Sequence, residues 1–142
     1  MAAAWSPAGD RIAYRGCVGD GRCGIALVSP AGGPPVLLTT HANDGQPAWS
    51  PAGLALTFVS DRDGNWEIYA INADGSWLRR ITDDPATDGL PEWSLDGMRI
   101  AFRSDRDGQW AIWVASGVGG PAVKLVDADA GADWQAERIA WK

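Results

Sequence analysis

The chain has 142 residues, which suits one domain or a part of one. Hydrophobic residues make up 46% of the sequence and charged residues 21%, so the chain is globular rather than disordered. The formal net charge of −6 argues against a nucleic-acid-binding protein held by a basic surface. No apolar run approaches the ~18 residues of a membrane-spanning helix, and the N-terminal residues show no signal peptide.

An internal repeat organises the whole sequence. Similar segments begin at four tryptophans, which are separated by 44, 44 and 41 residues: Trp5, Trp49, Trp93 and Trp134. Residues 49–82 and 93–126 align without a gap, and both contain the run Ser-Asp-Arg-Asp-Gly followed by a tryptophan two positions later. The last copy ends after two elements. A fixed period of this length indicates a repeat architecture.

Each repeat predicts four short strands. In the second copy we expect strands A to D at residues 46–50, 56–60, 66–71 and 78–82, separated by Ser-Pro-Ala-Gly, Asp-Arg-Asp-Gly-Asn and Asn-Ala-Asp-Gly-Ser turns. Strand C of the third copy, residues 110–115, is apolar on both faces and must be covered on both sides. We find no helical apolar pattern. A four-stranded unit of this length, covered by its neighbours, is a blade of a β-propeller, so we predict an all-β fold.

These segments resemble the WD40-like repeat of TolB-type β-propellers. The family pattern runs Pro-x-Trp-Ser-Pro-Asp-Gly, Ile-Ala-Phe, Ser-Asp-Arg-x-Gly, Ile-Tyr, Asn-x-Asp-Gly and Leu-Thr, and residues 46–126 match it closely. The chain departs from it at Ala8 and Ala52, where the family has aspartate, and in a first B–C turn that contains cysteines. The resemblance implies the fold and favours a periplasmic or extracellular site. It does not fix the function, because related repeats occur in periplasmic scaffold proteins, in gating domains of peptidases and in polysaccharide lyases.

The repeat predicts a partial β-propeller with three complete four-stranded antiparallel blades, at residues 4–39, 46–82 and 91–126, plus two strands of a fourth at residues 133–142. Propeller rings usually have four to eight blades. We therefore expect that the chain either closes a ring by self-association or is a piece of a longer gene product.

One face of the predicted disc is acidic. Antiparallel strands alternate in direction, so the A–B and C–D turns lie on one face, the turn face, and the B–C turns and D–A connections lie on the other, the loop face. Most of the aspartates fall on the loop face: Asp20, Asp44, Asp61, Asp63, Asp83, Asp84, Asp88, Asp105, Asp107, Asp127, Asp129 and Asp133. Aspartate is a common loop residue, but charge of one sign on one face also attracts a partner of opposite charge.

The Asp61-x-Asp63-x-Asn65 run has the alternating oxygen donors that begin a calcium loop, and Asp105-x-Asp107 is a weaker copy. Neither run has the later bidentate glutamate. Hairpin turns capped by aspartate explain both runs more simply, so we expect no cofactor and no calcium affinity tighter than about millimolar.

Cys17 and Cys23 flank the B–C turn of blade 1. Opposed positions on a hairpin can meet the short Cβ–Cβ distance of a disulfide, which would indicate an oxidising compartment. Two free thiols remain an equal alternative. Zinc is not expected, because His41 is the single histidine and no paired cysteine motif occurs.

Function is predicted as non-catalytic binding, because the sequence has no nucleophile-elbow, zinc-protease or phosphate-binding motif. The predicted partner is a protein or peptide, of basic character, on the loop face. The candidate contacts are Asp44, Asp83, Asp84, Asp88, Asp127, Asp129 and Asp133 and, in the C–D turn of the second copy, the non-repeated Trp77. The alternatives are the propeller portion of a larger enzyme, such as a peptidase or a polysaccharide lyase, and a carbohydrate-binding propeller that stacks sugars on Trp77.

Overall fold

The computed structural model describes residues 3–128, which form twelve β-strands and contain no helix. The first sheet contains β1 (Ala3–Trp5), β2 (Ile12–Cys17), β3 (Cys23–Val28) and β4 (Val36–Leu37). The second contains β5 (Gly45–Trp49), β6 (Ala55–Ser60), β7 (Glu67–Asn72) and β8 (Arg79–Arg80). The third contains β9 (Asp88–Trp93), β10 (Arg99–Ser104), β11 (Ala111–Ser116) and β12 (Val123–Asp127).

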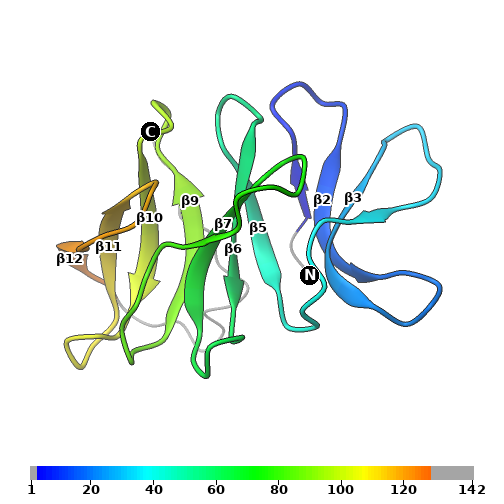
Figure 1. Ribbon diagram of the computed structural model, residues 1–142. Helices are drawn as coiled ribbons and strands as arrows, with labels where there is room; N and C mark the ends of the chain where they lie inside the picture. The colour runs from blue at the N-terminus through cyan, green and yellow to red at the C-terminus, as the bar shows by residue number, and fades with distance from the viewer. Residues whose placement is uncertain (1–2, 129–142) are drawn as a thin grey trace.

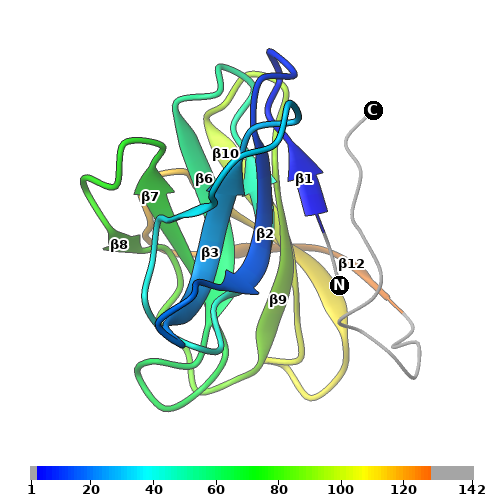
Figure 2. The ribbon, with the colours of Figure 1, turned by 90° about the vertical axis from the view of Figure 1, so that its right-hand side faces the viewer.

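The three sheets are antiparallel, with the strands in chain order, and they stand side by side as successive blades (Figure 1). Figure 2 looks onto the first sheet, with the other two stacked behind it. We name the sheets blade 1, blade 2 and blade 3. The prediction of an all-β partial propeller is confirmed. The half-blade expected at residues 133–142 lies outside the described residues. Within residues 3–128 there is no helix that could cross a membrane.

The A–B turns, Ser-Pro-Ala-Gly in blade 2 and Ser-Leu-Asp-Gly in blade 3, explain where strand A ends and strand B begins. In blade 2 the amide of Gly53 donates to the Ser50 carbonyl at 2.9 Å, and in blade 3 the amide of Gly97 donates to the Ser94 carbonyl at the same distance. Both glycines have a φ of 70°, in the left-handed region that suits glycine. The shared Ser-x-x-Gly pattern therefore fixes the same hairpin in both blades.

The interface between blades 1 and 2 joins a face of small and aliphatic residues to a face of large ones. Blade 1 contributes Ala4, Ala13 and Ile25, whereas blade 2 contributes aromatic and branched side chains: Trp49, Leu56, Phe58, Tyr69 and Ile71. The Trp49 indole N–H donates to the Ala4 carbonyl at 3.0 Å, which ties the innermost strands of the two blades together.

The interface between blades 2 and 3 repeats this arrangement. Blade 2 presents Ala55, Val59, Ile68, Ala70 and Ile81, and blade 3 presents Trp93, Ile100, Phe102, Trp113 and Ala115. Each blade therefore turns its aromatic face toward the preceding blade and its smaller face toward the following one. By its register with β2, in which Trp5 pairs with Ile12 and Ala3 with Tyr14, blade 1 has the same aromatic face, and Trp5 there is 59% exposed.

The outer strand of blade 2 is shorter than predicted. We expected residues 78–82 to form strand D of blade 2, but β8 covers only Arg79–Arg80. The reason is Thr82, whose hydroxyl accepts the Ile68 amide in place of a main-chain carbonyl and so ends the ladder. Thr39 does the same for Ile25 in blade 1.

The innermost strands β5 and β9 each contain a bulge. Gln46 and Leu90 occupy equivalent repeat positions and have positive φ angles of 51° and 52°. The Leu90 amide donates to the Gln46 side-chain oxygen at 2.8 Å, which links blade 2 to blade 3 near the centre of the array.

Candidate functional site

In blades 2 and 3, the Ser-Asp-Arg-Asp run of the B–C turn forms a clasp on the chain that enters the same blade. In blade 2, Nη2 of Arg62 donates to Oδ2 of Asp44 at 2.6 Å. In blade 3, Nη2 of Arg106 donates to Oδ2 of Asp88 at 2.8 Å. Asp44 and Asp88 lie immediately before or at the start of β5 and β9, so each arginine joins a B–C turn to the innermost strand of its own blade.

Packing holds the clasp arginines in place. The Arg62 guanidinium lies 5.5 Å from the Phe58 ring centroid and 4.9 Å from that of Tyr69. The Arg106 guanidinium lies at 5.2 Å from Phe102 and 4.8 Å from Trp113. Such distances are within the range of cation–π contacts. The two arginines therefore cover the ends of the aromatic columns between blades.

The first aspartate of the run adds a second contact to the entering chain. Asn43 donates its side-chain amide to Oδ2 of Asp61 at 2.9 Å, and the main-chain amide of Thr87 donates to Oδ1 of Asp105, also at 2.9 Å. Asp61 in addition lies 3.3 Å from Nε2 of His41. Asp61 and Asp105 are half-buried as a result.

Two of the expected partner contacts are interior residues. Asp44 and Asp88 are both 0% exposed, and each is paired with its arginine. A partner on the surface cannot reach them, so they do not belong to an exposed acidic surface. The structure corrects our assignment, because the repeated aspartate before strand A anchors the Ser-Asp-Arg-Asp clasp.

Burial also changes the acidity of the blade 3 clasp. Removal from water raises the pKa of Asp88 to about 6, although the Ser104 hydroxyl, the Arg106 guanidinium and the Thr82 hydroxyl all act to lower it. The second carboxylate oxygen of Asp88, Oδ1, is buried and accepts no hydrogen bond within residues 3–128. The stability that the blade 3 clasp contributes should therefore change with pH near the pKa of Asp88.

Glu67 is a buried carboxylate that the sequence analysis did not single out. It stands at the start of β7, is 0% exposed, and accepts from Arg80 Nη2 at 2.9 Å and from the Asp84 amide at 2.8 Å. The Thr82 hydroxyl and the Asn65 side chain also donate to it. Because the third copy has Ala111 at this position, no repeat signal marked Glu67.

Cations from the outer strands neutralise part of the loop face. Arg80 of β8 lies 3.9 Å from Asp63 and 3.2 Å from Asp83. Lys124 of β12 pairs with Asp107 and Asp127. Both cations come from outer strands, and their long side chains reach aspartates of the B–C turns. Asp84 is half-buried and caps the amide of Ala86. Asp129 and Asp133 lie outside the described residues.

The calcium candidates have separate partners. Asp63 accepts from the phenol of Tyr69, and burial followed by this hydrogen bond raises the pKa of Tyr69 above its usual range. Asn65 donates to Glu67 and to the main-chain carbonyls of Asp84 and Ala86. No three acidic, histidine or cysteine side chains in residues 3–128 are grouped as a metal site. The absence of tight calcium binding stays a prediction.

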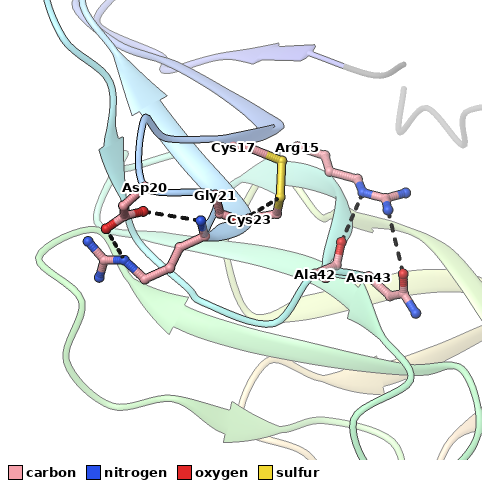
Figure 3. Close-up of a disulfide and its surroundings, with 8 residues drawn as sticks. Arg15, Cys17, Asp20, Gly21, Cys23, Ala42 and Asn43 are labelled. Carbon is pink, nitrogen blue, oxygen red and sulfur yellow. Dashed lines mark hydrogen bonds and ion pairs between the residues drawn. A yellow bond between two sulfur atoms is a disulfide. The ribbon is translucent and has the colours of Figure 1, made fainter.

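Blade 1 has a disulfide where the other blades have the clasp. Cys17 and Cys23 are opposite each other in the β2–β3 register and are joined by a bond between their sulfurs (Figure 3). Arg15, on the same strand, reaches the following connection, with Nε donating to the Ala42 carbonyl at 3.1 Å. The redox state of these cysteines in solution remains a prediction.

Trp77 lies on the turn face, in the C–D turn of blade 2, and is 58% exposed. The Arg79 guanidinium lies 3.9 Å from its ring centroid, so one side of the indole is already in contact. Arg79 also donates to the Gly117 carbonyl of blade 3 at 3.3 Å. The indole therefore offers one open side rather than two.

Exposed apolar side chains gather on the turn face, a feature that the sequence analysis missed. Besides Trp77, the A–B and C–D turns of blades 2 and 3 expose Leu54, Leu78, Leu95, Met98 and Val118. Leu54 and Met98 occupy matching repeat positions, but the others do not recur, so repetition alone did not reveal the group.

His41 has an acidic partner but no nucleophile. Among residues 3–128, no serine, threonine or cysteine side chain is hydrogen-bonded to it. A histidine–aspartate pair alone does not form a hydrolytic triad, which needs an activated nucleophile beside the histidine.

The fold and the clasp define a segment of a β-propeller with four-stranded blades. Residues 1–137 match the TolB beta propeller domain family, and the chain belongs to this family. An uncharacterized protein of Agrobacterium fabrum is 33% identical over 77 residues, which are 54% of this chain and 26% of that protein.

Solved structures agree with this assignment. A protein assigned as TolB from Agrobacterium tumefaciens superposes with a TM-score of 0.80 and 31% identity, over 87% of this chain and 45% of that one. TolB of Acinetobacter baumannii gives a TM-score of 0.74 and 27% identity, over 88% of this chain and 31% of that one. The chain thus spans less than half of either structure.

The same fold occurs in peptidases. A puromycin-hydrolyzing peptidase of Mycobacterium tuberculosis superposes with a TM-score of 0.72 over 94% of this chain and 24% of that one. At 20% identity this likeness concerns the fold alone.

Proposed function

We propose that the chain is a non-catalytic interaction module that binds a basic segment of a protein or peptide on its loop face. One observation carries the proposal. Among residues 3–128, the loop face has more carboxylates than cations even after Arg80 and Lys124 are counted with it. An excess of one charge on one face steers and orients a partner of opposite charge. The disulfide of blade 1 supports an oxidising location for this module.

The test uses a fluorescent lysine-rich peptide and measures anisotropy. The variant exchanges three exposed loop-face aspartates, Asp20, Asp83 and Asp127, for asparagine. We expect the wild type to bind the peptide at low ionic strength, to lose affinity as salt is raised, and to bind at least about threefold more tightly than the variant.

A matched control exchanges three turn-face aspartates, Asp10, Asp74 and Asp96, for asparagine. This control changes the net charge by the same amount on the opposite face. If the control loses as much affinity as the loop-face variant, the peptide responds to net charge alone and the proposed face is wrong.

A second candidate is the propeller portion of a peptidase. It is favoured by a 42% identity over 40 residues to the uncharacterized peptidase YuxL of Bacillus subtilis, which covers 28% of this chain and 6% of that protein. The test is the coding sequence that adjoins this chain. An α/β-hydrolase segment with a nucleophile-elbow motif in the same reading frame supports this candidate, and a frame without one contradicts it.

A further inference from the structure

The outer strand of blade 3 is longer than the outer strands of the other two blades. β12 has five residues, whereas β4 and β8 have two each. Hydroxyl groups end the ladders of blades 1 and 2 at Thr39 and Thr82. The third copy has Val126 in this place, 44 residues after Thr82. Because valine has no hydroxyl to replace a main-chain acceptor, the pairing with β11 continues to Asp127.

One edge of β12 has no strand beside it within residues 3–128. β12 pairs with β11 alone and lies at the outer edge of blade 3 (Figure 1). The Ala128 amide donates inward to the Trp110 carbonyl at 2.8 Å, so by alternation the N–H and C=O groups of Asp127 point to the free edge. Exposed main-chain groups of this kind can pair with an added extended strand.

The two faces of β12 have different side chains. The register with β11 places Val123 and Val126 on one face of the sheet. Lys124 and Asp127 lie on the other face, because Leu125 is the extra residue of a bulge between them. Val123 is 64% exposed and Val126 58%, so the first face is open and apolar at this edge.

The charged face of β12 has one more carboxylate than cations. Lys124 contacts both Asp127 and Asp107, which belongs to the B–C turn, so two carboxylates share a single ammonium group. Gln109 also donates to Asp127, but it has no charge. The Asp127 side chain is still 63% exposed and that of Asp107 36%. One basic side chain beside them would therefore balance the charge of this cluster.

We propose that β12 binds an extended, antiparallel peptide segment with one basic residue opposite Asp127 and apolar residues opposite Val126 and Val123. Residues opposite each other in an antiparallel pair have their side chains on the same face, so a basic residue that exchanges main-chain hydrogen bonds with Asp127 also reaches its carboxylate. The residue opposite Lys124 must be uncharged. The inference rests on the proposed function, a basic partner at the loop face, and names where and how that partner binds.

The test is a titration of the full chain with acetyl-Val-Lys-Val-Thr-Val-amide at low ionic strength, followed by the main-chain amide NMR signals. We expect the largest shifts in residues 123–127. Methylation of the lysine amide of the peptide, which faces β12, should weaken binding at least about tenfold. Methylation of the following valine amide, which points away from β12, should weaken it less than about threefold. Equal effects of the two methylations, or shifts confined to residues outside β12, overturn the strand addition.

Two variants with the same charge change separate this site from the loop face as a whole. Asp83 occupies the repeat position of Asp127 in blade 2, and its side chain is 85% exposed. We expect Asp127→Asn to lose at least about threefold more affinity for the peptide than Asp83→Asn. Equal losses, with binding that weakens as salt is raised, would overturn the strand site and leave the proposed function standing. Absence of binding by both this peptide and the lysine-rich peptide would overturn both.

Discussion

The clasp of blade 3 can be tested by removing its cation while keeping its packing. In Arg106→Met, the methionine keeps contact with Phe102 and Trp113 but leaves Asp88 buried without its ion partner. Asp88 is 0% exposed and the Arg106 side chain is 13% exposed, so solvent screens the pair weakly. Breaking a buried pair on one side costs about 3–5 kcal/mol, and we expect a loss near the lower end of this range at pH 7.5.

The loss of folding stability in Arg106→Met should depend on pH, and the pKa of Asp88 sets its direction. The pKa of Asp88 is about 6 in the folded protein and 3.8 in a model compound, so the folded state binds this proton more tightly than the unfolded state. Without Arg106 the folded pKa rises further. Stability from this group is therefore present below the unfolded pKa and is lost as the pH rises through the folded value. The deficit of Arg106→Met should be smaller at pH 5 than at pH 7.5.

Urea unfolding followed by tryptophan fluorescence measures this deficit. The double variant Asp88→Asn, Arg106→Met is the control, because it removes both charges and should be more stable at pH 7.5 than Arg106→Met alone. A deficit of equal size at pH 5 and pH 7.5, or a double variant that is less stable than the single one, would refute the clasp as a buried ion pair.

Three further outcomes are expected. Without reductant, denatured protein should show no reactive thiol, and reduction of Cys17–Cys23 should lower stability by about 2 kcal/mol for so short a loop; two free thiols would contradict the bond. Phe58→Ala should lower the free energy of unfolding by about 3–5 kcal/mol, because the Phe58 ring is fully buried. Tyr14 occupies the same repeat position in blade 1 but is only half-buried, so Tyr14→Ala should cost less. Equal losses would mean that the face of blade 1 that carries Tyr14 is covered in solution. Calorimetric titration should detect no calcium affinity tighter than about millimolar, and micromolar binding abolished by Asp61→Ala would overturn this expectation.

Local signals made the architecture predictable. Strand positions follow from turn residues such as Gly53 and Gly97 and from the alternation of buried side chains, and both are encoded within a few positions. The shortened outer strand β8 was not predictable in this way, because its length depends on the Thr82 hydroxyl replacing a main-chain acceptor for the Ile68 amide.

The candidate site was less accessible from the sequence. An aspartate in a polar loop has the same local pattern whether it is solvated like Asp83 or buried like Asp88. Recurrence of an aspartate alone does not separate the two cases, because exposed Asp83 recurs at the repeat period as Asp127. A usable signal was that Asp44 and Asp88 recur together with Arg62 and Arg106. The reach of Arg80 and Lys124 to the B–C turns depends on side-chain conformation, which no spacing rule provides.

The unequal faces of the blades give the array a polarity. An aromatic face contacts a face of smaller residues at both junctions, so two aromatic faces or two smaller faces do not fit each other. Any sheet that covers Trp5 and Tyr14 of blade 1 must present small side chains and a carbonyl at the place where Ala4 receives the Trp49 indole. Copies joined through these surfaces would add head to tail, and a twofold dimer would have to use the loop face or the turn face instead.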